Sequence, residues 1–127
     1  MRVASFRVAL RRFFRVTEVA ARDSGLTPRQ YLLLLLVKGS PDGTEQTTVG
    51  SLCKRLHLAQ STVTELVSRA ELAGLVSATQ SETDGRVSEI RLTEDGEKRL
   101  ADCFSRLADE RRTLRDALAE HDVTTMI

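Results

Sequence analysis

The polar side chains best suited to binding another molecule lie between residues 60 and 86. The first group occupies one predicted helix and comprises Gln60, Ser61, Thr62, Thr64, Glu65, Ser68 and Arg69. Short hydroxyl side chains let a backbone approach closely and can bond phosphates or base edges, whereas a glutamine can contact adenine through two hydrogen bonds. The N-terminus of a helix also favours a phosphate. We therefore predict that this helix contacts double-stranded DNA in the major groove.

Two members of this group have more than one reasonable role. Glu65 can accept a hydrogen bond from the N4 amino group of cytosine, or it is a solvated charge that repels phosphate. Arg69 can bind a phosphate, or it pairs with Glu65, which precedes it by four residues on the same helix. The sequence leaves both alternatives open.

A second group lies at a predicted hairpin turn. Asp84 and Gly85 form the Asp-Gly pair that is typical of a tight turn between two strands. Arg86 follows this turn and could enter a narrow, electronegative minor groove. Asp84 could brace the guanidinium through a charge-assisted hydrogen bond. The hairpin is therefore predicted to provide a second contact with DNA.

The remaining reactive side chains match no catalytic or metal-binding motif. The sequence contains no Gly-x-Ser-x-Gly elbow, no phosphate-binding glycine loop and no His-Glu-x-x-His motif. His57 and His121 lie far apart without a cluster of carboxylates or thiols. We expect no enzymatic activity, no cofactor and no metal.

Cys53 falls on the apolar face of a predicted helix, which favours a buried structural thiol. Redox sensing through Cys53 or Cys103 stays an alternative.

Composition and charge indicate a single small globular domain. The chain has 127 residues, of which 41% are hydrophobic, and it contains no apolar run long enough to cross a membrane. Two cysteines do not make a disulfide framework, so we expect a cytoplasmic protein. The net charge is only +1, yet residues 1–38 carry a net charge of +6 and residues 93–127 a net charge of −3. The two ends could therefore pack together, within one chain or across a dimer.

Apolar spacing and turn residues indicate the elements that position these groups. The predicted order is a helix over residues 1–24, a helix over residues 28–38, a loop over residues 39–47, a short helix over residues 49–56, a break over residues 57–59, a helix over residues 60–73, strands over residues 75–80 and 87–92, and a single last helix over residues 93–120. Thr27, Thr48 and Thr93 are the predicted N-caps, and Gly25 and Gly74 the predicted helix ends.

A short helix, a break, a second helix and a hairpin together form a winged helix-turn-helix. Residues 26–100 resemble the MarR family (multiple-antibiotic-resistance regulators), through the stretches LTPRQYLLLLLVKG, TTVGSLCKRLHLAQSTVTELVSRAELAGLV and SETDGRVSEIRLTEDGEKRL. The resemblance implies a mainly α fold with a small β-wing (α+β), in which residues 47–92 bind DNA and residues 1–24 and 93–120 form dimerisation helices. It also implies a homodimer on a pseudo-palindromic operator, acting as a repressor that a small-molecule effector relieves.

The sequence departs from this family at three places. Glu65 stands where a basic residue is common, Ala59 replaces the usual N-cap serine, and Ser77-Ala78 replaces a frequent basic pair. Residues 47–92 contain five basic and five acidic residues, so the module has no net charge to attract phosphates. Two alternatives therefore stay open, a winged-helix protein-interaction module with weak DNA binding and a cysteine-based redox-sensing regulator.

Overall fold

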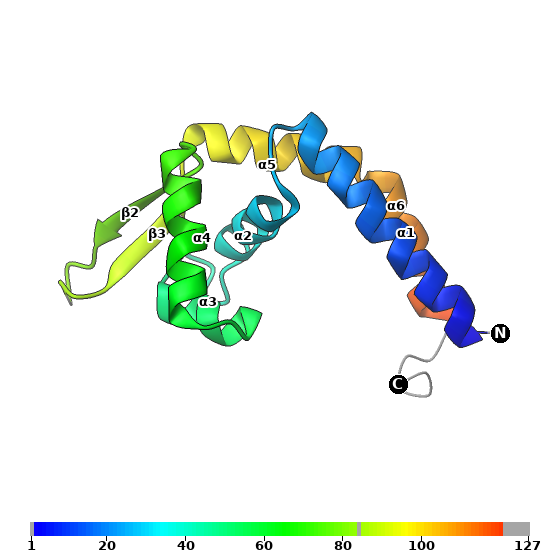
Figure 1. The fold of residues 1–127 in the computed structure, drawn as a ribbon, viewed down its shortest axis with the longest axis horizontal. Helices are drawn as coiled ribbons and strands as arrows, with labels where there is room; N and C mark the ends of the chain where they lie inside the picture. The colour runs from blue at the N-terminus through cyan, green and yellow to red at the C-terminus, as the bar shows by residue number, and fades with distance from the viewer. Residues whose placement is uncertain (1, 84, 121–127) are drawn as a thin grey trace. The chain divides into compact units, whose positions relative to one another are not determined.

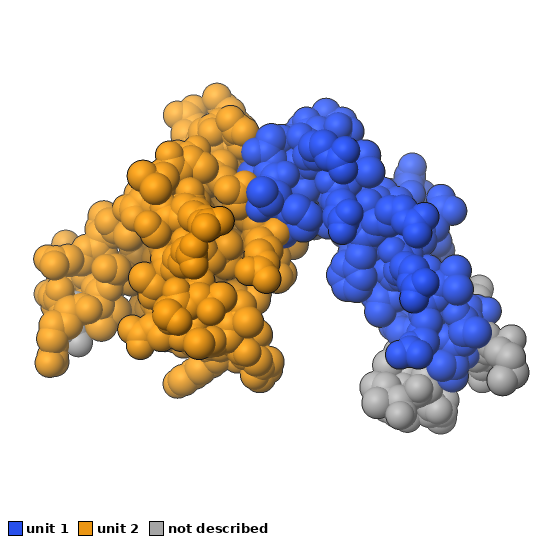
Figure 2. Space-filling model, in the orientation of Figure 1, with its two compact units in different colours: residues 1–28, 102–127 blue, residues 29–101 orange. Residues whose placement is uncertain are grey.

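The computed structural model describes residues 2–83 and 85–120, and it confirms a mainly helical fold with a small sheet (Figure 1). Its elements are α1 (Arg2–Asp23), α2 (Pro28–Lys38), β1 (Gln46–Thr47), α3 (Val49–Leu56), α4 (Gln60–Leu72), β2 (Val76–Gln80), β3 (Ser88–Leu92), α5 (Glu94–Arg106) and α6 (Ala108–Glu120). The chain divides into two compact units (Figure 2). We call residues 1–28 with 102–127 the helical unit and residues 29–101 the sheet unit. Within the described ranges, no helix is both long and apolar enough to span a bilayer.

Helix α1 lies beside α6 in the helical unit and ends as its sequence predicted (Figure 1). The N–H group of Leu26 donates to the Ala21 carbonyl at 2.8 Å, and that of Gly25 donates to the Arg22 carbonyl at 3.0 Å. These are the two hydrogen bonds of a Schellman motif. Gly25 has a φ of 75°, which a residue without a Cβ adopts at little steric cost.

The prediction of a single last helix is wrong, because the helix is interrupted at Leu107. Helix α5 ends at Arg106 and α6 begins at Ala108, and the side chain of the intervening Leu107 is fully buried. The Phe104 carbonyl accepts a hydrogen bond from the Leu107 N–H at 3.3 Å and another from the Arg111 guanidinium. The Arg111 guanidinium carbon also lies 3.4 Å from the centroid of the Phe104 ring. These contacts depend on the folded backbone, and neither proline nor glycine marks the break in the sequence.

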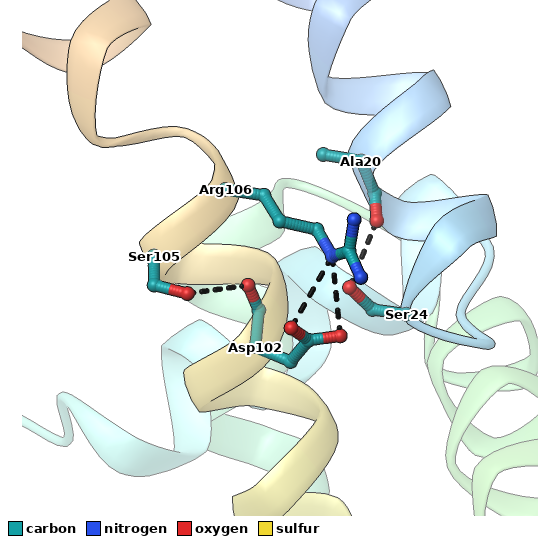
Figure 3. A network of polar contacts seen from close by, with 5 residues as sticks. All are labelled: Ala20, Ser24, Asp102, Ser105 and Arg106. Atoms are coloured by element: carbon teal, nitrogen blue, oxygen red, sulfur yellow. Dashed lines mark hydrogen bonds and ion pairs between the residues drawn. The ribbon is translucent and has the colours of Figure 1, made fainter.

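Polar side chains near the ends of α1 and α5 are satisfied by hydrogen bonds to neighbouring residues of the chain (Figure 3). The Ser24 hydroxyl donates to the Ala20 carbonyl at 2.9 Å, and the Ser105 hydroxyl donates to the Asp102 carbonyl at 2.9 Å. The Nε of Arg106 donates to both carboxylate oxygens of Asp102 at 3.2 Å. Each bond joins residues three or four positions apart, so these polar groups stabilise local structure.

Helix α2 provides the most buried side chains of the sheet unit. Leu33, Leu34 and Val37 have no exposed surface, as the apolar run predicted, whereas Leu32 remains 45% exposed. The helix begins at Pro28, where the missing N–H of proline costs no hydrogen bond. The N-terminal proline and the apolar run together account for the position of this helix and for its burial.

A three-stranded antiparallel sheet with the order β1-β3-β2 completes the sheet unit. Strands β2 and β3 form the predicted hairpin, in which Val76 pairs with Leu92 and Gln80 pairs with Ser88. The predicted loop over residues 39–47 is wrong at its end, because Gln46 and Thr47 form β1 against β3. A two-residue strand is too short to show an alternating pattern, and its partner lies more than forty residues away.

Candidate nucleic-acid interface

The predicted helix-break-helix is present in the sheet unit. Thr48 caps α3 by accepting a hydrogen bond from the Ser51 N–H at 3.1 Å. His57 ends α3 with a φ of 55°, in the left-handed region, and α4 begins three residues later. Leu52 on α3 and Val63 on α4 are fully buried, so the apolar faces of both helices contribute to the core. This packing leaves the opposite face of α4 open to solvent.

The exposed face of α4 gathers most of the residues predicted to bind DNA. A shallow surface hollow is lined by Gln60, Ser61, Thr64, Glu65, Ser68 and Arg69, all of them exposed. We call these six residues the α4 face. Thr62 is half-buried and does not line this hollow, so of the predicted α4 residues it is the least available to a partner. The structure thus brings six of the seven predicted α4 residues onto one surface.

The N-terminus of α4 lacks a side-chain cap. Its N-cap residue is Ala59, whose extended backbone makes no side-chain hydrogen bond to the first turn. The first N–H groups of a helix have no partner within the helix, and they carry the positive end of its dipole. Since Gln60 and Ser61 of the α4 face lie in this first turn, an anion bound there would contact both backbone and side-chain donors.

Arg69 is paired with Glu65 on the α4 face. The Nη2 of Arg69 lies 2.7 Å from the Oε1 of Glu65, one helical turn away. The two side chains are 73% and 64% exposed respectively, so the pair lies in solvent. The face therefore has one positive and one negative charge that largely cancel. Of the two roles left open for Arg69, the pairing with Glu65 is the one present in this structure.

The hairpin tip has its own local hydrogen bonds. The Ser81 N–H donates to the Val87 carbonyl at 2.8 Å, which extends the pairing of β2 and β3 by one step. The Thr83 N–H donates to the Ser81 hydroxyl at 3.3 Å. Arg86 is exposed just before β3, whereas Asp84, the residue predicted to brace it, lies outside the described residues. The described part of the hairpin therefore carries an exposed cation just before β3.

Another basic residue of the module has an internal role. The Nη1 of Arg55 on α3 donates a hydrogen bond of 2.8 Å to the Leu36 carbonyl of α2. The guanidinium thus ties α3 to the C-terminal turn of α2, whose carbonyl groups have no partner within the helix. Charge counting along the sequence missed this role, because it requires knowledge of which helices are neighbours.

The two thiols lie in different surroundings. Cys103 is fully buried, and burial raises the pKa of its thiol, although a hydrogen bond with Ser24 acts in the opposite direction. Cys53 is half-buried on α3. A buried thiol with a raised pKa is a poor nucleophile, since the thiolate is the reactive form. Among residues 2–83 and 85–120, no group of three or more histidine, cysteine or carboxylate side chains could hold a metal ion.

A second polar hollow in the sheet unit was not predicted from the sequence. It is lined by Ser40, Pro41, Asp42, Gln46, Thr47, Thr48, Ser51 and Glu89. Hydrogen bonds from the hydroxyl and N–H of Thr44 lower the pKa of Asp42. These bonds order the loop before β1, and Lys38 also contributes through ion pairs of 3.1 Å with Glu45 and with Glu97.

Comparison with known proteins places this architecture in one family. A family model described as "MarR family" matches residues 24–87, which is half of the chain. The organic hydroperoxide resistance transcriptional regulator of Bacillus subtilis (strain 168) is 39% identical over 71 residues, which cover 56% of this chain and 46% of that protein. The matched segment thus spans less than half the length of that curated relative.

Solved structures share the fold over nearly the whole chain. AbsC, a MarR family transcriptional regulator from Streptomyces coelicolor, has a TM-score of 0.77 at 24% identity, covering 97% of this chain and 82% of its own. A mutant of MarR from E. coli, complexed with operator DNA, has a TM-score of 0.76 at 19% identity, covering 94% of this chain and 84% of its own. By the family match and this shared winged-helix fold, the chain belongs to the MarR family of transcriptional regulators.

Proposed function

We propose that the protein is a sequence-specific regulator that inserts α4 into the major groove of double-stranded DNA. The observation that carries this proposal is the α4 face, where six polar side chains lie together on the second helix of a helix-turn-helix. A helix fits the width of the major groove, where each base pair presents a distinct pattern of donors and acceptors. The hairpin carries Arg86 to the adjacent minor groove, where a cation is attracted by the negative potential.

The active form is a homodimer assembled through the helical unit. Large apolar side chains remain exposed on this unit of the single chain, namely Val3, Val8, Phe14, Val19, Phe104 and Leu118. Three others, Leu32, Leu58 and Leu72, are exposed on the sheet unit, so most of the exposed large apolar side chains of the described residues belong to the helical unit. Exposed apolar surface of this kind is typical of an interface with another protein. Two symmetry-related recognition helices bind a pseudo-palindromic operator whose half-sites lie about 34 Å apart, one turn of DNA, or a small multiple of it.

The regulatory output proposed is repression that a small molecule relieves. The mutant of MarR among the structural relatives was crystallised with operator DNA. For another relative, BpsR of Bordetella bronchiseptica, regulation of DNA binding by 6-hydroxynicotinic acid has been described. These proteins share the fold with this chain, and their behaviour supports the proposal by analogy.

Footprinting of the purified full chain on the DNA that flanks its own gene tests this function. We expect a protected pseudo-palindrome, with an affinity that falls steeply between about 50 and 200 mM salt as counterions are released. A reporter gene under the same DNA should be silenced by the protein. Absence of any protected sequence at low salt would contradict the proposal.

A protein-binding role is the second candidate, and the pairing of Arg69 with Glu65 favours it. This pair leaves the α4 face without net charge, which weakens attraction to phosphates. The salt series separates the two functions, because the affinity for a protein partner bound through a surface without net charge depends much less on salt concentration. A redox function has less support, since burial and a raised thiol pKa disfavour reaction at Cys103.

A further inference from the structure

The ion pair on the α4 face places a carboxylate where DNA would be contacted. Glu65 and Arg69 are exposed members of the same face as Gln60, Ser61 and Ser68, and Glu65 is the only acidic residue among the six. A carboxylate near phosphates is repelled, which makes it costly for a surface that serves only for electrostatic attachment. A hydrogen-bond donor on the DNA would offset this cost.

The major groove offers few donors to a carboxylate. An ionised carboxylate only accepts hydrogen bonds, and the donors in the groove are the N4 amino group of cytosine and the N6 amino group of adenine. Adenine also presents the N7 acceptor beside its amino group, whereas guanine and the O4 of thymine present acceptors that repel a carboxylate. Cytosine is therefore the base that best matches Glu65.

Arg69 orients the Glu65 side chain for this contact through a hydrogen bond. The hydrogen bond of 2.7 Å engages Oε1, so the second oxygen of Glu65 stays available as an acceptor. A side chain already held in one orientation loses less conformational freedom when it binds. The adjacent guanidinium also offsets the repulsion between the carboxylate and the DNA backbone.

We propose that Glu65, oriented by Arg69, is a specificity-determining residue that selects a cytosine in each half-site of the operator. This assignment rests on the proposed function, in which α4 enters the major groove. In this assignment the α4 face, which has no net charge, discriminates between bases, and Arg69 is a positioning residue.

Selection from a library of randomised DNA duplexes tests the assignment with the full chain. The wild type should enrich a sequence with one strongly preferred cytosine per half-site. Glu65→Gln, which can donate as well as accept, should lower the preference at that single position by about tenfold and leave the other positions unchanged. The matched control is Glu71→Gln, because Glu71 is exposed on the same helix but does not line the α4 face. This control should retain the wild-type preference.

A second variant examines the positioning role. Arg69→Met keeps an apolar stem and should weaken the same cytosine preference several-fold. If Arg69 instead served only as a phosphate contact, Arg69→Met would weaken binding to all sequences equally and reduce the salt dependence by about one counterion. That result would overturn the positioning role. Both side chains are exposed, so the melting temperatures of all variants should match that of the wild type.

The outcomes separate this assignment from the proposed function. If the wild type and Glu65→Gln enrich the same sequence with the same preferences, Glu65 is not a specificity residue, although DNA binding by α4 stands. If the wild type enriches no sequence, the proposed function fails and the assignment fails with it.

Discussion

The Thr93 hydroxyl donates a hydrogen bond of 2.6 Å to the Gly74 carbonyl. The same hydroxyl accepts a hydrogen bond of 3.0 Å from the Gly96 N–H, which caps α5. The Thr93 N–H in turn donates to the Leu75 carbonyl at 3.0 Å. One residue therefore fixes the turn after α4 to the first turn of α5, and this connection holds the base of the hairpin.

Replacement of Thr93 by valine tests this connection. Thr93→Val keeps the shape of the side chain but removes the cap and the donor to Gly74, so the free energy of unfolding should fall by about 1–2 kcal/mol. Thr93→Ser retains the hydroxyl and should lose less than about 0.5 kcal/mol. Urea denaturation followed by circular dichroism measures both. A larger loss in Thr93→Ser than in Thr93→Val would show that the methyl group, rather than the hydroxyl, makes the connection.

Gly96 permits the close approach of α5 to the turn after α4. Any side chain at Gly96 would collide with the Leu75 carbonyl oxygen, so Gly96→Ala should destabilise the protein by about 1–3 kcal/mol. Gly50 on α3 provides the opposite case, because a Cβ there meets only the Thr48 hydroxyl at 3.9 Å. Gly50→Ala should leave stability unchanged or raise it by up to about 1 kcal/mol. Thermal unfolding of the pair measures the difference, and similar values for both would contradict the packing.

Arg86 should contribute more to DNA affinity than an equal charge elsewhere on the surface. Arg86→Ala should weaken binding to the selected duplex by about tenfold, because the proposed contact of Arg86 with the minor groove would be lost. Arg91→Ala removes an equal charge from the exposed surface of β3 and is the matched control. Fluorescence anisotropy on both variants across a salt series makes the comparison. Equal losses would mean that only overall charge matters.

Oligomerisation should depend on the exposed apolar surface of the helical unit. Phe14→Glu places a charge where 58% of an aromatic side chain is exposed, and it should shift the protein toward monomer in sedimentation experiments. Leu72→Glu alters a side chain that is 87% exposed on α4 of the sheet unit, and it should leave the assembly unchanged. A dimer that persists in Phe14→Glu would place the interface elsewhere.

The Cys103 thiol should react slowly in the folded protein. Burial raises its pKa, so the thiolate fraction near neutral pH is below that of an ordinary cysteine. Iodoacetamide should modify the half-buried Cys53 first and Cys103 only upon unfolding. Peroxide treatment should leave both DNA binding and the titratable Cys103 thiol intact. Loss of binding that Cys103→Ser prevents would instead support the redox alternative.

The same shift predicts the direction of a pH effect. A thiol whose pKa is raised in the folded state keeps its proton after the unfolded chain has lost it. Above the ordinary pKa of 9.0, the unfolded state therefore binds fewer protons, and the free energy of unfolding should fall as pH rises. Cys103→Ala removes this contribution and should flatten the alkaline part of the stability profile.

Local signals made most of the elements predictable. Pro28, Thr48 and Thr93 lie where the helices that they introduce begin, and Gly25 and Gly74 have positive φ at the ends of α1 and α4. As starts and ends of helices these residues act through their own backbone or the next few residues, so these effects can be deduced from sequence. The bonds from Thr93 to Gly74 and Leu75 join distant segments and could not be deduced in this way.

Features that depend on distant contacts were not predictable. Strand β1 exists because β3 offers an open edge, and the break at Leu107 is stabilised by the Arg111 side chain one turn later. For the α4 face, the periodicity predicted the exposed residues but not the choice of Arg69 between a phosphate and Glu65. That choice depends on a small difference in free energy between two solvent-exposed charge pairs, which the sequence does not reveal.

The absence of a cap at Ala59 has a consequence for the motion of α4. A helix whose first turn lacks a side-chain partner frays more readily, so the amide group of Thr62 should exchange with solvent faster than the equivalent amide of Ser51, which the Thr48 hydroxyl protects. A phosphate at this position would supply the missing acceptors and slow that exchange. The first turn of α4 would then become fully ordered only when DNA is bound. The cost of ordering this turn would reduce the net free energy of binding.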